Sequence, residues 1–209
     1  MASDSTRQRV LEAAGEVFAR EGFKAATVRE IVEKAGANLS AVNYHFRDKE
    51  TLYSEVLNYL VSSSVERYPI DGGADPQAQP HERLRAYVRS FLCRALCVGQ
   101  PAWKGDLMTR EMMEPSPMFN TVVERVVLPI RQHLERLVSE ISPADPRDVA
   151  LRANSIIAQC VFYKHFERFA PRLSSPTLPA GEERIELLTD HITRFSLAGM
   201  TGFSKETQA

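Results

Sequence analysis

Uncharged hydrogen-bonding side chains are concentrated in residues 37–46, with the sequence ANLSAVNYHF. This segment carries two amides, a serine, a tyrosine and a histidine, and residues 36–47 contain no carboxylate. Amides and hydroxyls can hydrogen-bond to base edges, while a surface without acids does not repel phosphates. The segment therefore indicates recognition of double-stranded DNA. The simpler alternative is the polar surface of a small helical subdomain.

Two helices must position this segment from its N-terminal side. Ser5 and Gln8 can form a capping box ahead of a first helix, whose apolar stripe stops at Gly22. Thr27 and Glu30 repeat the capping pattern and predict a second helix of about two turns.

A third short helix contains the polar segment itself. Asn38 can cap it, and Val42 and Phe46 lie four residues apart on a face that we assign to the core. The opposite face carries Ser40, Asn43 and Tyr44. Asp48 then caps a longer helix that runs from residue 49 towards residue 68. Two short helices joined by a tight glycine-containing turn predict a helix-turn-helix unit.

The order of short motifs between residues 6 and 57 is specific. The landmarks G-F, A-T-V-R-E-I, A-G and Y-H-F-x-D-K-E-x-L follow one another at fixed spacing. With them, this segment resembles the TetR family of bacterial transcriptional repressors. The resemblance implies an all-α fold: an N-terminal three-helix helix-turn-helix DNA-binding domain, expected at residues 1–50, followed by a helical ligand-binding and dimerisation domain at residues 51–209. It also implies a homodimer that binds a palindromic DNA operator and is released by a small-molecule inducer.

The same resemblance assigns DNA-contacting roles. Short side chains and an amide on the third helix are the expected base readers, namely Ser40, Ala41 and Asn43. Neighbouring residues resemble the family's phosphate clamps, namely Tyr44, His45 and Lys49. We also expect contacts from Thr27, Arg29 and Asn38. The family often has tyrosine where Asn43 stands, so operator sequence cannot be transferred from it.

The remainder of the chain is predicted to be helical around one exposed connector. Residues 69–80, PIDGGADPQAQP, are too rich in glycine and proline for a helix. Pro129 should kink one of the later helices because it lacks a backbone donor. Helices are expected near residues 81–98, 102–113, 117–141, 146–170 and 181–199. The stretches TREMMEPSPMF and IIAQCVFYKHF also resemble the C-terminal domain of one TetR subgroup.

Two further surfaces are predicted in this region. Apolar stripes on the last two helices predict a four-helix dimer interface formed by Ile156, Cys160, Ile185, Leu188, Ile192 and Phe195. Aromatic, methionine and polar side chains predict a ligand site lined by Phe91, Trp103, Met108, Arg110, Met112, Phe119, Gln159, Tyr163 and His165. An ordinary intramolecular core is the alternative for both sets.

Composition limits the other classes of function. The 209 residues carry a net charge of −1, and residues 1–50 hold eight basic and eight acidic side chains, so bulk charge does not indicate DNA binding. Without an apolar run of membrane-spanning length or a secretion signal, we expect a cytoplasmic protein with reduced cysteines. No nucleophile elbow, zinc motif or phosphate loop is present, so neither an enzyme nor a cofactor is expected. The alternative regulator is a metal or redox sensor that uses Cys93 and Cys97, with His165 or Cys160 completing the site.

Overall fold

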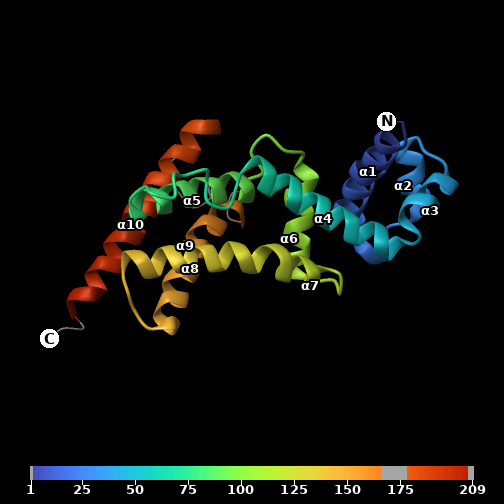
Figure 1. The fold of residues 1–209 in the computed structure, drawn as a ribbon. Helices are drawn as coiled ribbons and strands as arrows, with labels where there is room; N and C mark the ends of the chain where they lie inside the picture. Colours follow the sequence, from blue (N-terminus) through green and yellow to red (C-terminus); the bar gives the residue numbers. More distant parts are fainter. Residues whose placement is uncertain (1, 166–177, 207–209) are drawn as a thin grey trace. The chain divides into compact units, whose positions relative to one another are not determined.

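The computed structural model describes residues 2–165 and 178–206 (Figure 1). Within these ranges every regular element is a helix and no strand occurs, which confirms the predicted all-α fold. The chain packs into two compact units, Met1–Ser64 with Gly99–Val127, and Val65–Val98 with Leu128–Ala209. These units are defined by packing, and the functional division expected at residue 50 stays a prediction.

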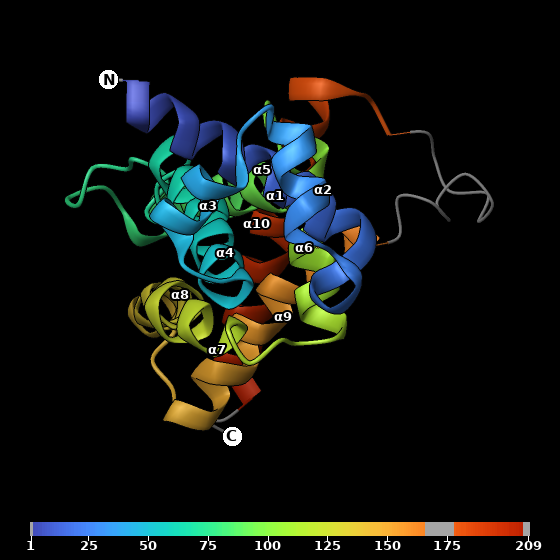
Figure 2. The same cartoon turned by 90° about the vertical axis from the view of Figure 1, so that its right-hand side faces the viewer.

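The first unit is built around helix α1 (Ala2–Ala25), which packs against α2 (Val28–Ala35), α3 (Leu39–Phe46) and α6 (Ala102–Met113). Helices α2 and α6, which both pack against α1, are seen beside it in Figure 2. Helix α1 begins three residues before the predicted cap at Ser5. Gly22 breaks it with φ 79° and ψ 166°, so the stop predicted at this glycine is confirmed. Only glycine reaches such angles at little cost.

Local capping determines where the next helices begin. Thr27 has an extended backbone, and its Oγ1 accepts a hydrogen bond from the Glu30 amide at 3.2 Å. Asp48 Oδ1 accepts one from the Thr51 amide at 2.7 Å and so caps α4 (Lys49–Arg67). This bond lowers the pKa of the Asp48 carboxyl, because it stabilises the charged form. Both predicted caps are confirmed.

Helix α4 is tied to α1 by aromatic packing in the first unit. The rings of Phe18 and Tyr53 meet edge to face at 4.7 Å, and both side chains are fully buried. The Tyr53 hydroxyl donates to the buried carboxylate of Glu111 on α6, so three helices share this contact. Burial and this hydrogen bond raise the pKa of Tyr53. The unit also contains α7 (Phe119–Val122) and a π-helical turn, η1 (Val123–Val127).

The second unit contains α5 (Pro80–Ala95), α8 (Leu128–Ile141), α9 (Pro146–His165) and α10 (Gly181–Glu206). Helix α5 packs against the other three helices, and α9 lies against α8 and α10. Their apolar core includes Leu84, Tyr87, Leu134, Leu137, Ala153, Ile156, Leu188 and Ile192.

Several predicted boundaries need adjustment. Helix α6 has the predicted bounds, whereas α5 ends at Ala95 and α10 continues to Glu206. The single helix expected at residues 117–141 is instead α7, η1 and α8. Its irregular turn lies just before Pro129, whose missing amide hydrogen cannot serve a carbonyl four residues back. Residues 166–170 of the predicted 146–170 helix lie outside the described residues.

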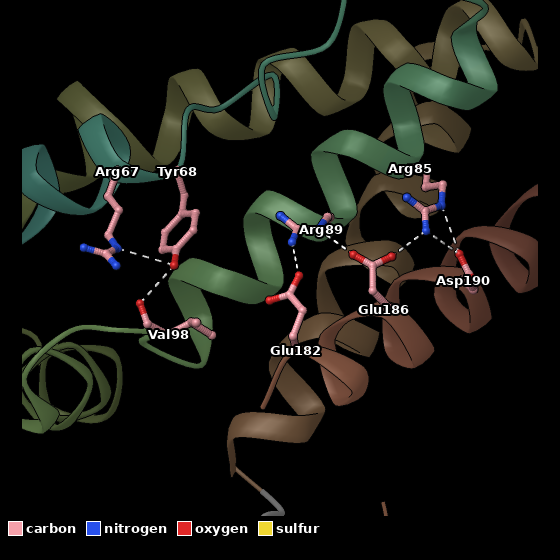
Figure 3. A network of polar contacts seen from close by, with 8 residues as sticks. All are labelled: Arg67, Tyr68, Arg85, Arg89, Val98, Glu182, Glu186 and Asp190. Atoms are coloured by element: carbon pink, nitrogen blue, oxygen red, sulfur yellow. Dashed lines mark hydrogen bonds and ion pairs between the residues drawn. The ribbon is translucent and has the colours of Figure 1, made fainter. Parts of the chain in front are cut away.

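Ion pairs join α5 to α10 in the second unit (Figure 3). Arg85 contacts Glu186 at 2.7 Å and Asp190 at 2.8 Å. Arg89 contacts Glu186 at 2.7 Å and also pairs with Glu182. The two arginines, Arg89 first, lower the pKa of the Glu186 carboxyl.

The connector predicted at residues 69–80 contains no helix up to residue 79 and is mostly exposed, whereas its last residue, Pro80, begins α5. It is nevertheless attached to α5, because Ser90 Oγ donates to the carbonyl of Pro69 at 2.5 Å. Gly72 has φ 68°, and a Cβ there would lie 2.3 Å from the carbonyl oxygen of Ala86. A glycine is therefore required where the connector approaches α5.

Candidate nucleic-acid interface

Helix α3 separates its apolar and polar side chains as predicted. Val42 and Phe46 are buried, with 3% and 1% of their surface exposed. One helical turn places them on the same side, directed towards the packed helices. Ser40, Asn43 and Tyr44 are exposed, and Tyr44 has 81% of its surface accessible. The core contact thus holds α3 in place while its hydrogen-bonding groups stay available.

The beginning of α2 supplies a second exposed group. Thr27 and Arg29 are both exposed, and Thr27 precedes the first helical turn. Helix N-termini present backbone amides and a partial positive charge, which suit a phosphate oxygen. The side-chain oxygen of Thr27 already serves the Glu30 amide, so the cap and a phosphate contact by neighbouring amides are compatible.

Lys49 places a positive charge beside the start of α2. Its Nζ donates to the carbonyl of Ala26 at 3.1 Å and to that of Lys24 at 3.4 Å. It also lies 4.8 Å from the centre of the Phe23 ring. Because Ala26 precedes Thr27, the ammonium group lies beside the start of α2. Lys49 therefore has a structural role that the sequence did not indicate, and its third donor is compatible with a phosphate contact.

The net charge beside α3 depends on which basic residues are paired. Arg7 contacts Glu55 at 2.5 Å and lies 5.5 Å from the Phe46 ring, so it is engaged within the fold. In the part of the chain that the structure describes, neither Arg29 nor Arg47 forms an ion pair, and both are exposed. These two arginines, one on α2 and one directly after α3, are therefore free of ion pairs among the described residues.

The other predicted DNA-contacting residues differ in exposure. Asn38 is exposed, and its carbonyl accepts from the Val42 amide at 3.3 Å at the start of α3. His45 is half-buried, with its ring 5.2 Å from that of Tyr44. The side chain of Ala41 lies outside the described residues. No structural observation tests the DNA contacts themselves, so these assignments stay predictions.

One exposed residue beside this surface was not predicted. Leu39 is the first residue of α3 and has 53% of its surface exposed. An apolar side chain there can contact a thymine methyl group. Its spacing of three residues from Val42 would have predicted burial, so no sequence signal indicated its exposure.

The nine predicted ligand-contacting residues are divided between the two units. Phe91, Gln159, Tyr163 and His165 belong to the second unit, and the other five belong to the first. Within the first unit, Trp103 Nε1 donates to Glu12 at 3.2 Å, and Arg110 Nη2 donates to the Arg20 carbonyl at 3.0 Å. Both side chains therefore support α1. Met108 is half-buried, Met112 is 51% exposed and Phe119 is 8% exposed. The ligand site stays a prediction.

The six predicted interface residues differ in burial. Only Phe195, at 64%, is substantially exposed. The other five have exposures between 0 and 2% within their own chain, namely Ile156, Cys160, Ile185, Leu188 and Ile192. Among the residues of these two helices whose burial is described, the large exposed apolar side chains are Leu151, Phe162, Leu187 and Phe195. Dimerisation itself is not tested by a single chain.

Two of the three cysteines, Cys93 and Cys160, are core residues, whereas Cys97 is half-buried. Burial raises the pKa of Cys93, and raises that of Cys160 to about 12, so both thiols are held protonated at neutral pH. Cys97 Sγ lies 3.6 Å from the Arg94 carbonyl. No group of three or more His, Cys, Asp or Glu side chains suited to a metal occurs within residues 2–165 and 178–206. In the same ranges, no helix is long and apolar enough to cross a membrane.

Comparison with known proteins supports the reading of both parts of the chain. Residues 10–56 match the family model for bacterial regulatory proteins of the tetR family. Residues 80–200 match the C-terminal domain of the HTH-type transcriptional dual regulator CecR. CecR from Shigella flexneri is 25% identical over 206 residues, covering 91% of this chain and 89% of that protein. The transcriptional repressor KstR2 from Mycobacterium tuberculosis is 35% identical over 89 residues, covering 42% of this chain and 44% of its own.

Solved structures share the fold. A tetR-family regulatory protein from Rhodococcus RHA1 aligns with a TM-score of 0.69 and 18% identity, covering 93% of this chain and 96% of its own. AibR, solved in complex with isovaleryl coenzyme A and operator DNA, aligns with a TM-score of 0.66 and 18% identity, covering 91% and 97%. With its helix-turn-helix unit and its CecR-type C-terminal domain, the chain belongs to the TetR family and is a DNA-binding transcriptional regulator, not an enzyme.

Proposed function

We propose that this protein is a homodimeric repressor that binds an inverted-repeat operator and leaves it when a small molecule binds. The observation that carries the proposal is the exposed, uncharged polar face of α3, held on a core through Val42 and Phe46. A rigid helix with exposed amide and hydroxyl groups can enter the major groove and read base edges. Its place of action would be the cytoplasm, where bacterial DNA lies.

Sequence reading and backbone anchoring are assigned to different residues. Ser40, Ala41 and Asn43 are the proposed base readers, since an amide can pair with adenine in the major groove. Tyr44 and Lys49 are the proposed phosphate clamps, joined by Arg29 and the amides at the start of α2. The positive charges of Arg29 and Arg47 add a sequence-independent, salt-sensitive contribution to affinity.

Dimerisation is proposed to use the outer faces of α9 and α10. Leu187 and Phe195 lie eight residues apart on α10 and are 47% and 64% exposed. Phe162 of α9 is 46% exposed, and Gln159 Nε2 donates to Ser196 Oγ at 3.2 Å, which keeps α9 beside α10. Pairing these faces with a second copy would remove exposed apolar surface from water. The buried residues Ile185 and Ile192 would support this interface from behind.

The interface can be tested by substitution of Phe195. Phe195→Glu would place a carboxylate in the apolar contact and should give monomers in sedimentation experiments, with weak operator binding. His191→Glu places a carboxylate on the same exposed face, at the ring 6.2 Å from that of Phe195, and should also weaken the dimer. A Phe195→Glu protein that stays dimeric would place the interface elsewhere.

Release by a ligand requires unequal binding to two states of the protein. A tenfold preference for the DNA-incompetent state changes the operator equilibrium by only about 1.4 kcal/mol, so effective release needs a larger preference. The names of two similar proteins support the proposal: KstR2 is a repressor, and AibR was solved with both a coenzyme A thioester and operator DNA. The four predicted ligand-contacting residues of the second unit remain our candidates for the site, namely Phe91, Gln159, Tyr163 and His165.

Selection of bound sequences from random DNA tests the central proposal. The full chain should enrich an inverted repeat whose half-site centres lie one helical turn, about 34–36 Å, or a multiple of it apart. A direct repeat, or no enrichment above random DNA, would contradict a symmetric dimer reading two half-sites. Asn43→Ala should relax the preference at one base position in each half-site.

Activation at some promoters is a second candidate. It is favoured by the similarity to CecR, a dual regulator, over 91% of this chain. Transcription in vitro from a template that carries the selected operator would decide between repression and activation. Reduced transcript with added protein supports repression, and increased transcript supports activation.

A further inference from the structure

The four arginines of α5 have different electrostatic environments, and Arg83 pairs with Glu140 of α8. Arg85 and Arg89 pair with carboxylates of α10, as Figure 3 shows. Arg94, one to two turns further along, forms no ion pair with any carboxylate among the described residues. Its Nη1 donates to the Tyr68 carbonyl at 2.6 Å, the Pro69 carbonyl at 3.1 Å and Ser90 Oγ at 2.7 Å. Half of this guanidinium group thus holds the connector to α5.

The other half of the Arg94 guanidinium group is buried without a partner among the described residues. Its Nη2 is inaccessible and makes no hydrogen bond within the described part of the chain. Burial lowers the pKa of Arg94, while interactions with Tyr87, Cys93 and Cys160 act to raise it. A buried cation without a counter-ion is costly. Its retention needs an explanation beyond the contacts of Nη1.

A second unpaired donor lies in the same region. Tyr87 is fully buried, and its hydroxyl also lacks a hydrogen-bond partner within the described residues. Electrostatic coupling links Tyr87 to Arg94 and to Cys160. The Phe91 ring lies 6.0 Å from the Tyr87 ring and 5.8 Å from the Arg94 guanidinium carbon. A cation and a phenol are therefore gathered among aromatic and apolar groups of α5 and α9.

These groups select one kind of ligand chemistry. A carboxylate can accept from a guanidinium nitrogen and from a phenol at once, and one negative charge would balance Arg94. A phosphate dianion would bring a second charge, which is less well balanced here. Arg85 and Arg89 are already paired, and burial lowers the pKa of His133, whose ring is stacked 6.0 Å from that of Tyr87, so its charged form is disfavoured. The apolar surroundings favour a hydrophobic body attached to the carboxylate.

We propose that Arg94 and Tyr87 bind the carboxylate of an apolar monocarboxylic acid within the second unit. This inference rests on the proposed function in that such an acid would be a releasing ligand. It adds Tyr87 and Arg94 to the predicted ligand residues. The predicted Phe91 lies beside both, and Tyr163 packs against the same core.

Thermal unfolding of the full chain with three matched probe pairs tests the proposal. The pairs are octanoate with octanamide, benzoate with benzamide, and phenylacetate with phenylacetamide, at constant ionic strength. At least one acid should raise the unfolding temperature saturably and more than its amide. Tyr87→Phe should weaken binding of that acid several-fold, and Arg94→Met by about tenfold or more, since hydrogen bonds to charged groups are the stronger ones.

Tyr87→Phe separates a ligand site from a structural role. Its hydroxyl makes no hydrogen bond to the described protein, so its removal should leave ligand-free stability unchanged or increased. A loss of ligand-free stability would instead show that the hydroxyl is structurally satisfied, for example by buried water, and would overturn the proposal. Arg94→Lys keeps a charge and should retain part of the binding, which covers the case in which Arg94→Met does not fold.

Controls keep this inference distinct from the proposed function. Arg85→Met removes a paired arginine of the same helix and should leave acid binding unchanged. Acids that stabilise no more than their amides, or that bind Arg94→Met as tightly as the parent, would overturn the carboxylate site. Operator binding is measured separately on the same proteins. A parent that binds its operator but none of the acids contradicts only this inference, whereas one that binds an acid but no DNA contradicts only the repressor proposal.

Discussion

Helices α3 and α6 belong to the same unit and contain similar polar and aromatic side chains, yet they use them in opposite ways. On α3, Asn43 and Tyr44 are exposed. On α6, Trp103, Lys104 and Glu111 have only 6%, 5% and 2% of their surface exposed. Residue type alone therefore does not distinguish a side chain available to a partner from one that holds the fold together.

The polar groups of α6 are satisfied within the protein. Glu111 Oε2 accepts from the Ser116 amide at 3.0 Å and from its hydroxyl at 2.9 Å. Lys104 Nζ donates to Ser63 Oγ at 2.7 Å and lies 4.7 Å from the Tyr59 ring. Substitutions in α6 should therefore change the free energy of unfolding, whereas substitutions on the exposed face of α3 should change DNA binding.

The largest effect is expected at Trp103. Its ring packs against α1 and is stacked 6.5 Å from the Tyr59 ring. Trp103→Ala should lower the free energy of unfolding by about 3–5 kcal/mol, because it leaves a cavity and removes the hydrogen bond to Glu12. Urea denaturation measures the change, with Trp103→Phe as the smaller control. A loss below about 1 kcal/mol would show that Trp103 faces a site able to collapse or fill, and would revive it as a ligand contact.

Gly15→Ala tests the same contact from α1. An added Cβ would lie 2.5 Å from Trp103 Cζ3, closer than carbon atoms approach, so the variant should lose about 1–3 kcal/mol of stability. The loss should shrink in a Trp103→Ala background, where the methyl group has room. Gly199→Ala is the matched control, since its Cβ meets no atom within 4 Å and alanine favours a helix. Additive effects of the two substitutions would contradict the close contact.

Asn43→Ala should change DNA binding and leave stability almost unchanged. Because the side chain is exposed, unfolding should change by less than about 0.5 kcal/mol. Affinity for the selected operator should fall by about 1–3 kcal/mol, with little change on random DNA. Fluorescence anisotropy with both DNAs makes the comparison. Equal losses on the two would remove Asn43 from the base readers.

Lys49→Ala should lower both DNA affinity and the free energy of unfolding, each by a smaller amount. Loss of a phosphate contact would weaken binding to all sequences similarly and reduce the slope of log affinity against log salt by about one unit. Loss of the contacts with the Ala26 carbonyl and the Phe23 ring should also destabilise the unit slightly. Salt titrations of operator binding and urea denaturation separate the two. An unchanged salt slope would leave Lys49 with a structural role alone.

The smallest effect is expected for the contribution of Tyr59 to stability at alkaline pH. Burial, followed by the hydrogen bond to Glu12, raises the pKa of Tyr59 to about 12. A raised pKa contributes stability that is complete below the ordinary value of about 10 and is lost as pH rises through the folded value. The stability advantage of the parent over Tyr59→Phe should therefore shrink between pH 10 and 12. An advantage that is constant over this range would show that the folded state does not favour the protonated phenol.

Much of the first unit could be predicted because its signals are local. Thr27 and Asp48 cap their helices through bonds that span three residues, and Gly22 ends the regular part of α1 through its own φ angle. The spacing of Val42 and Phe46 likewise identifies the buried face of α3 without reference to any distant residue. Local geometry and helical periodicity were sufficient to predict these helix ends and this buried face.

The roles of the other polar and apolar stripes depended on distant partners. Helix α10 carries apolar residues on two faces, so periodicity could not tell that Ile185 and Ile192 would meet α5 and α9 while Leu187 and Phe195 would stay exposed. Trp103 and Arg110 similarly took structural roles only because α6 packs beside α1. The sequence by itself determined the all-α class, the helix-turn-helix unit and the polar face of α3, since these follow from contacts within a few residues. Tertiary structure alone decided which of the remaining side chains are buried, because burial depends on which distant helix arrives on each face.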